Sequence, residues 1–164
     1  MYILYSRIYC SVGEAIVPIG RSDRGHQVQP RETEMNDNPI QNFFDTMLDR
    51  WRQERSKTQM TLGQLIERLN ELDPELEMVG LTEPHSYRGY YADLAFEIDS
   101  RERLACEVLV DAIDSLDKTF EGYKGGNYIM ASDAPVWIAS YGCCGKRLMA
   151  VNDDGTIITA EEED

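Results

Sequence analysis

The sequence lacks any long hydrophobic run, since no window approaches the roughly 20 apolar residues that a membrane-spanning helix needs. Its first residues also lack the basic segment, apolar stretch and small-residue cleavage site that are typical of a secretory signal. We therefore expect a cytoplasmic protein that does not cross a membrane. The length of 164 residues suits one globular domain with an appendage.

Positive charge is scarce, with 16 Lys and Arg against 30 Asp and Glu and a net charge of −14. An acidic field repels the phosphate backbone, so we expect no direct binding to nucleic acid. Residues 1–59 hold 8 basic and 8 acidic side chains, whereas residues 60–164 hold 8 basic and 22 acidic ones. This asymmetry predicts an N-terminal extension, residues 1–59, and an acidic core domain, residues 60–164.

Histidine and cysteine are also scarce, so few residues are available as catalytic groups or metal ligands. The two histidines are His26 and His85, and the four cysteines lack the two-residue spacing of zinc knuckles. Glu97 and Asp99 share one face of a predicted strand, but charges at a strand end are more often solvated than paired for catalysis. We expect no metal and no cofactor, and a binding protein is favoured over an enzyme.

The extension is predicted to contain two short strands, Tyr2–Tyr9 and Glu14–Ile19, then a mobile linker over 20–38 and a helix over 40–55. The helix carries large apolar residues at helical spacing: Ile40, Phe43, Phe44, Met47, Leu48 and Trp51. We expect this stripe to pack against the body of the protein or to join two copies in a homo-oligomer.

The core domain opens with Thr61-Leu62-Gly63-Gln64, which predicts a capping box and a helix that begins at Leu62. A second helix is expected from Leu104 to Leu116. Strands are expected over 76–81 and 90–98, with a loop over 82–89 between them, and then as a meander over 127–130, 135–141, 147–152 and 156–160. The predicted fold class is α+β: an antiparallel β-meander sheet with helices packed on one face, plus the N-terminal strand/helix extension.

Three segments of the acidic core combine tyrosine, glycine and a cation. Arginine offers a planar fork for phosphate, glycine lets backbone N–H groups approach an anion, and tyrosine offers a flat face for a base. If the segments converge, they form a ligand site from Tyr87, Arg88, Tyr90, Tyr91, Tyr123, Lys124, Tyr141, Lys146 and Arg147. The alternative is that the glycines mark tight turns and the cations offset nearby carboxylates.

The part from Met60 to about Leu148 resembles a group of small proteins encoded by tailed bacteriophages and prophages. The resemblance rests on Thr61–Ile66, on Ser86–Tyr91 with Leu94-Ala95-Phe96, on Gly122–Gly126, and on Val136–Gly142. It implies a phage context and action in the host cytoplasm, and it carries no settled activity over to this chain.

Three functions follow as hypotheses. The first is a non-enzymatic binding protein that captures a small nucleotide-like anion, such as a host defence signal. The second is an acidic inhibitor of a host defence or nucleic-acid-binding protein, which would use Glu102, Glu107, Asp111, Asp114 and the acidic tail. The third is a small nucleotide-acting enzyme that uses His85 or a carboxylate.

Overall fold

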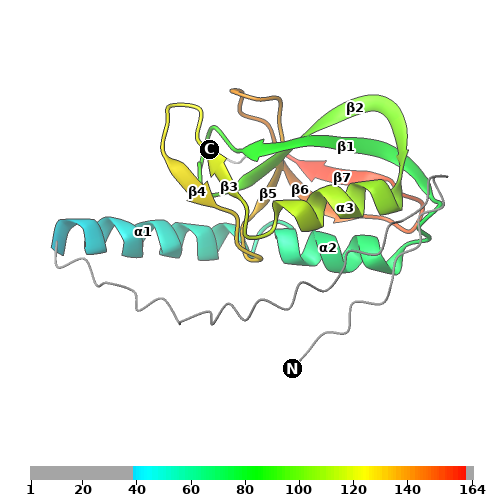
Figure 1. Cartoon of the computed structure of the whole chain (residues 1–164). Coiled ribbons are helices and arrows are strands. Elements are labelled where there is room, and N and C mark those ends of the chain that lie inside the picture. Colours follow the sequence, from blue (N-terminus) through cyan, green and yellow to red (C-terminus); the bar gives the residue numbers. More distant parts are fainter. Residues whose placement is uncertain (1–38, 162–164) are drawn as a thin grey trace, which may run out of the picture.

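The computed structural model describes residues 39–161 (Figure 1). Its elements are α1 Pro39–Arg55, α2 Leu62–Glu71, β1 Glu77–Ser86, β2 Leu94–Leu104, α3 Ala105–Ser115, β3 Thr119–Glu121, β4 Asn127–Ile129, β5 Val136–Ile138, β6 Lys146–Val151 and β7 Ile157–Ala160. The strands predicted before residue 20 and the predicted linker over 20–38 lie outside the described residues.

The larger sheet has five strands in the order β1-β2-β5-β6-β7, and β3 and β4 form a separate two-stranded sheet. All neighbours in the larger sheet are antiparallel except β2 and β5, which run parallel. The connection between these two strands contains α3 and the β3–β4 hairpin, which is long enough for a parallel crossover. The α+β class is confirmed, and the meander holds for β5, β6 and β7.

The strand predicted over 127–130 is real but does not belong to the meander. As β4 it pairs with β3, a strand that the sequence analysis did not predict, and Phe120 lies opposite Tyr128. Phe120 is buried in the main core, which holds this short pair against the body. Three residues are too few to show the alternation by which a strand is recognised in a sequence.

The loop predicted over 82–89 is also wrong in part, because β1 continues to Ser86. A bulge between Thr82 and His85 places Glu83 at a φ of 46° and accommodates Pro84 within the strand. The next strand begins at Leu94 rather than at the predicted residue 90. Before it the chain turns, with the N–H of Asp93 donating to the carbonyl of Tyr90 at 2.9 Å.

The two core helices begin where the sequence predicts. Thr61 forms the capping box, because its hydroxyl accepts from the N–H of Gln64 and its own N–H donates to the Gln64 side chain. Both helices lie on the same side of the larger sheet, and their apolar faces share one core with it (Figure 1). The buried residues of α2 are Leu62, Leu65 and Leu69.

Helix α1 covers the predicted range, but its apolar stripe is not fully packed against the body. Phe43 is 61% exposed and Trp51 is 48% exposed. The prediction that the stripe packs against the body of the same chain is therefore wrong for these two residues. Figure 1 shows the N-terminal part of α1 extending past the body, while its C-terminal end lies against it. Association with a second copy through this helix stays a prediction.

The larger sheet curls until its two edge strands approach each other. A Cβ atom added at Gly155, in the turn between β6 and β7, would lie 2.7 Å from the Cβ of Met78 in β1. Gly155 has a φ of 80°, so this close approach and the turn both favour glycine. The sheet therefore encloses the core on one side and leaves a wedge between its edges.

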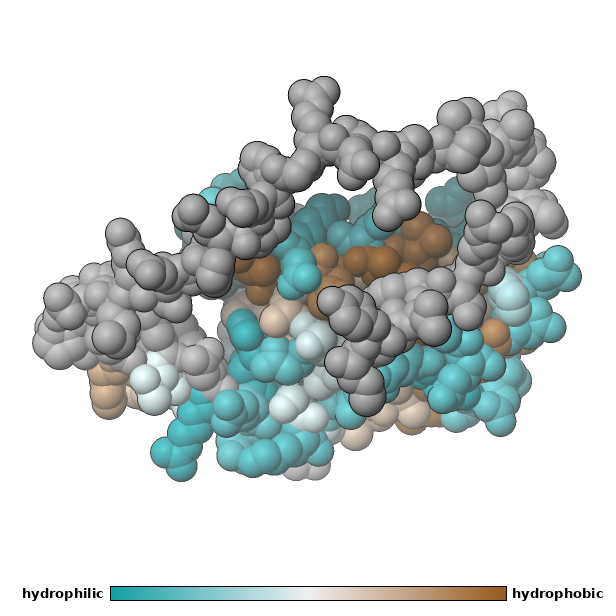
Figure 2. All heavy atoms as spheres, turned by 60° about the horizontal axis from the view of Figure 1, so that its bottom comes forward, coloured by the Kyte–Doolittle hydropathy of each residue, from teal (hydrophilic) through white to brown (hydrophobic). Residues whose placement is uncertain are grey.

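None of the helices within residues 39–161 is long and apolar enough to cross a membrane. Figure 2 brings the underside of Figure 1 forward and shows mainly hydrophilic residues around a central group of hydrophobic ones.

Candidate functional site

The three predicted segments do meet, at the end of the sheet where β1 stops. Arg88 follows β1, Tyr123 lies in the β3–β4 turn, and Tyr141 and Gly142 follow β5. The Arg88 guanidinium donates from Nη1 to the carbonyl oxygen of Gly142 at 2.6 Å, which ties the first segment to the third. We call Arg88, Tyr123, Tyr141 and Gly142 the loop cluster.

Aromatic contacts complete the loop cluster. The Arg88 guanidinium carbon lies 5.1 Å from the centre of the Tyr123 ring, within the range of a cation–π contact. The rings of Tyr123 and Tyr141 meet edge to face, with centres 5.8 Å apart. Tyr123 is 46% exposed and Tyr141 is 55% exposed, so both keep surface that a flat ligand can cover.

Position 142 requires a glycine. Its φ is 77°, and a Cβ atom at this position would lie 2.8 Å from Cε2 of Tyr123. A side chain there would therefore be strained by the backbone and would push the Tyr123 ring away. The glycine lets the third segment approach the second closely enough for Arg88 to contact both.

His85 adjoins the loop cluster from the end of β1. Its Nδ1 lies 2.8 Å from the carbonyl of Glu83, and its ring meets Tyr141 edge to face at 5.5 Å. The Nε2 atom is buried and has no hydrogen-bond partner among the described residues. A carbonyl oxygen only accepts, so Nδ1 is the donor in this contact, and in the described part of the chain no nucleophilic side chain is hydrogen-bonded to Nε2.

Tyr87 lies below the loop cluster and is fully buried, so its face is not open to a ligand. Its ring stacks on Trp137, with centres 4.2 Å apart and planes 6° from parallel. Its hydroxyl accepts from the backbone N–H of Gly145 at 3.2 Å. Tyr87 therefore anchors the first segment to the sheet and to the third segment.

Tyr90 and Tyr91 are directed to other neighbours. The Arg55 guanidinium lies 3.8 Å from the centre of the Tyr90 ring, so Tyr90 packs beneath the end of α1. Tyr91 meets Tyr128 of β4 edge to face at 5.6 Å. Both tyrosines brace the first segment, one against α1 and the other against the hairpin.

The predicted cations differ in their surroundings. Lys124 is exposed at the β3–β4 turn, beside Tyr123 in the sequence, and within residues 39–161 it forms no ion pair. Lys146 pairs with the Glu161 carboxylate at 2.8 Å, and Arg147 donates to the Glu161 carbonyl at 3.0 Å and 3.2 Å. The structure thus brings Arg88 together with Tyr123 and Tyr141, and it engages Lys146 and Arg147 with the end of β7.

Glu97 and Asp99, which the sequence analysis did not favour as a catalytic pair, bind separate partners. Glu97 accepts from the backbone N–H of Tyr141 at 2.6 Å, and so it positions the loop cluster. Asp99 binds Arg101, whose hydrogen bonds hold the pKa of the Asp99 carboxyl below its usual range. Glu97 and Asp99 therefore each have a hydrogen-bond partner of their own.

A buried ionic network under the site was missed by the sequence analysis. Asp93 is fully buried and accepts from Nε and Nη2 of Arg55 at 2.7 and 2.8 Å, and from Nε1 of Trp137 at 3.0 Å. Burial raises the pKa of Asp93, while Arg55 and then Trp137 act in the opposite direction. A signal was present in the sequence, because an Asp directly before the buried run Leu94-Ala95-Phe96 needs a partner.

The described residues hold no group of three or more His, Cys, Asp or Glu side chains that could bind a metal ion. The vicinal Cys143 and Cys144 are exposed beside the loop cluster, and Cys106 is buried in α3. Comparison of the chain with protein-family models, with curated proteins and with solved structures found no match.

Proposed function

We propose that the protein is a non-enzymatic binding protein that captures a small nucleotide-like anion at the loop cluster. The observation that carries the proposal is the meeting of Arg88, Tyr123 and Tyr141 from three separate parts of the chain. These residue types supply a fork for phosphate and exposed aromatic faces for a base.

The charge of the anion would be met by Arg88 and Lys124. A guanidinium has five N–H donors, and the contact with the Gly142 carbonyl uses one donor group of Arg88. Arg88 and Lys124 are both exposed, so a ligand can reach them without unfolding the loops. Glu97 is a negative neighbour, but its Oε1 atom is hydrogen-bonded to the Tyr141 backbone, so the phosphate would lie on the Arg88 side.

The base or another flat group would stack on Tyr123 and Tyr141. Stacking on an aromatic side chain contributes about 1–3 kcal/mol per base in nucleic-acid-binding proteins. The Tyr87–Trp137 stack and the Glu97 contact hold the loops before a ligand arrives, which lowers the ordering cost of binding. The resemblance to phage-encoded proteins favours a nucleotide signal of host defence as the ligand class.

The proposal is tested by calorimetric titration of the full chain with linear and cyclic nucleotides. Arg88→Lys keeps the charge but loses the fork, so it should weaken binding by about 1.5–3 kcal/mol, or roughly ten- to a hundredfold. Arg101→Lys makes the same change at an exposed arginine outside the cluster and should leave affinity unchanged.

Two results would count against the proposal. One is a parent protein that binds none of the nucleotides. The other is an equal loss of affinity in Arg88→Lys and in Arg101→Lys, since a general effect of positive charge would then explain the binding. In the first case, a loss of thermal stability in Arg88→Lys would also make Arg88 a purely structural residue.

A further inference from the structure

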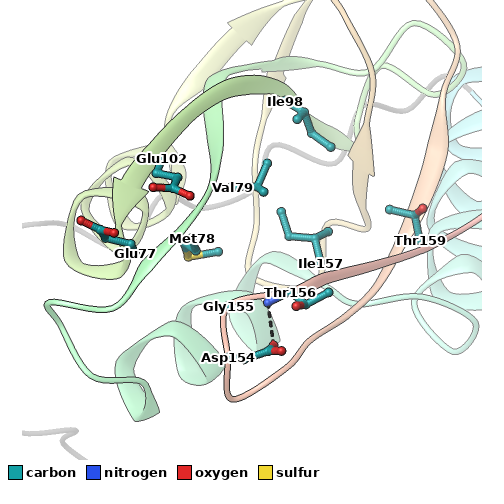
Figure 3. Close-up of a pocket in the computed structure, with 10 residues that line it drawn as sticks. All are labelled: Glu77, Met78, Val79, Ile98, Glu102, Asp154, Gly155, Thr156, Ile157 and Thr159. Carbon is teal, nitrogen blue, oxygen red and sulfur yellow. Dashed lines mark hydrogen bonds between the residues drawn. The ribbon is translucent and has the colours of Figure 1, made fainter.

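A pocket of about 410 Å³ lies in the wedge between the two edges of the curled sheet (Figure 3). It is lined by the start of β1, the later part of β2, and β7 with the turn before it. The loop cluster lies at the opposite end of β1, after Ser86, so the two sites are separate. Nothing in the proposed function uses this pocket.

Apolar side chains from three strands meet in the pocket. Val79 of β1 is 45% exposed and Ile98 of β2 is 50% exposed. In Figure 3 these two side chains and Ile157 of β7 are directed toward a common space. Single exposed apolar residues are ordinary, but these three line one hollow and give it an apolar wall.

The rim of the pocket is negative. Glu77, Glu102 and Asp154 line it, and no Lys or Arg is among its lining residues. The Asp154 carboxylate accepts from the backbone N–H of Thr156 at 2.9 Å, which lowers the pKa of Asp154 and keeps it ionised at neutral pH. Glu77 and Glu102 are exposed. The rim is therefore complementary to a cation.

Two sheet edges flank the pocket. Within the described part of the chain, β1 pairs with β2 alone and β7 pairs with β6 alone. An unpaired edge presents N–H and C=O groups to which an extended peptide can add as a further strand. The contact between Gly155 and Met78 closes one end of the wedge. Strand β7 has four residues, which matches about 13 Å of extended peptide.

We propose that this pocket binds an extended segment of another protein in which Lys or Arg alternates with apolar side chains. The apolar side chains enter between Val79, Ile98 and Ile157, the cations meet the three rim carboxylates, and the peptide backbone pairs with a sheet edge. None of the residues that line this pocket belongs to the loop cluster.

The test uses a fluorescein-labelled seven-residue peptide of alternating Lys and Val, titrated with the full chain and followed by fluorescence anisotropy. This peptide should bind, and the matched Glu and Val peptide should not. A Lys and Val peptide methylated on alternate backbone nitrogens keeps its charge but cannot pair with an edge, so it should bind about tenfold more weakly.

Variants of the protein then locate the binding. Glu77→Gln and Glu102→Gln should each weaken the Lys and Val peptide about fivefold, and Ile98→Ser should weaken it further. Ile98 is half exposed, so its replacement should cost little stability. Asp114→Asn removes an exposed carboxylate from α3 outside the pocket and should have no effect.

The proposal is overturned if the Lys and Val peptide fails to bind, if the backbone-methylated peptide binds equally well, or if Asp114→Asn weakens binding as much as Glu102→Gln. The last result would mean that the peptide responds to the overall negative charge rather than to this pocket. Adding a nucleotide at saturation should leave peptide affinity unchanged, which keeps this test separate from that of the loop cluster.

Discussion

A buried carboxylate, Asp93, links three parts of the molecule at the scale of single residues. It lies in the turn before β2, binds Arg55 at the end of α1, and accepts from Trp137 of β5. A charge with no exposed surface is costly unless it is paired and hydrogen-bonded, and these contacts meet that need. The network therefore joins α1 to the sheet.

Arg55→Met should destabilise the protein by about 3 kcal/mol or more, because it leaves the Asp93 carboxylate buried and unpaired. Arg55→Met with Asp93→Asn removes the charge and should recover part of this loss. The measurement is urea unfolding followed by tryptophan emission, to which the buried Trp137 and the half-exposed Trp51 both contribute. Equal stability of the single and double variants would show that the unpaired charge is not what destabilises the fold.

The loss of folding stability in Arg55→Met should also depend on pH. Burial raises the folded pKa of Asp93 and Arg55 opposes the rise, so removing Arg55 raises this pKa further. A carboxyl with a raised folded pKa contributes stability that is present at low pH and is lost as pH rises through that pKa. Relative to the parent, the variant should thus be least stable near about pH 8 and should improve toward about pH 5. A difference in unfolding free energy between the parent and Arg55→Met that grows as the pH falls would contradict this account.

Gly142→Ala should cost about 1–2 kcal/mol of stability and should disrupt ligand binding, because it adds both backbone strain and a clash with Tyr123. Gly125→Ala is the matched control, since Gly125 also has a positive φ, 89°, but no atom lies within 4 Å of the added Cβ. Thermal unfolding and nucleotide titration compare the two. If Gly125→Ala reduced nucleotide affinity as much as Gly142→Ala, the packing of Tyr123 would not be the reason.

At the scale of elements, the helices could be predicted because their signals are local. The Thr61–Gln64 capping box and the spacing of Leu62, Leu65 and Leu69 are complete within a few residues of sequence. The β3–β4 pair and the parallel pairing of β2 with β5 depend on contacts far apart in the chain. The extension of β1 across Pro84 depends on a bulge, which alternation of residue types does not reveal.

Helix α1 carries two large apolar side chains with exposed surface, Phe43 and Trp51. If the helix joins two copies, the parent protein should dimerise with rising concentration, and Phe43→Glu with Trp51→Glu should stay monomeric. Sedimentation velocity separates the two states. Arg50→Glu on the exposed surface of the same helix makes the same change in net charge and serves as the control. A parent that is monomeric throughout would rule out this association.

At the scale of the whole molecule, residue types and spacing indicate candidate site residues but not which of them lie in contact in the fold. Arg88, Tyr123 and Tyr141 come together as the sequence analysis expected, because their turns close at one end of the sheet. Residue type alone does not show that Tyr87 and Lys146 differ from these three residues. Tyr87 stacks on Trp137 and Lys146 pairs with Glu161, and neither contact is visible in the sequence. The acidic pocket at the other end of β1 was not foreseen, because it forms only when β1 and β7 approach.

The central claim is that a nucleotide binds at the loop cluster, and an NMR titration of the ¹⁵N-labelled chain tests it most directly. Adding a linear or cyclic nucleotide should shift the amide signals of Arg88, Tyr123, Tyr141 and Gly142, while those of Met78 and Gly155 stay in place. The claim is contradicted if no signal moves up to about 5 mM nucleotide, which is too weak for a dedicated site, or if the shifts are confined to the pocket between β1 and β7.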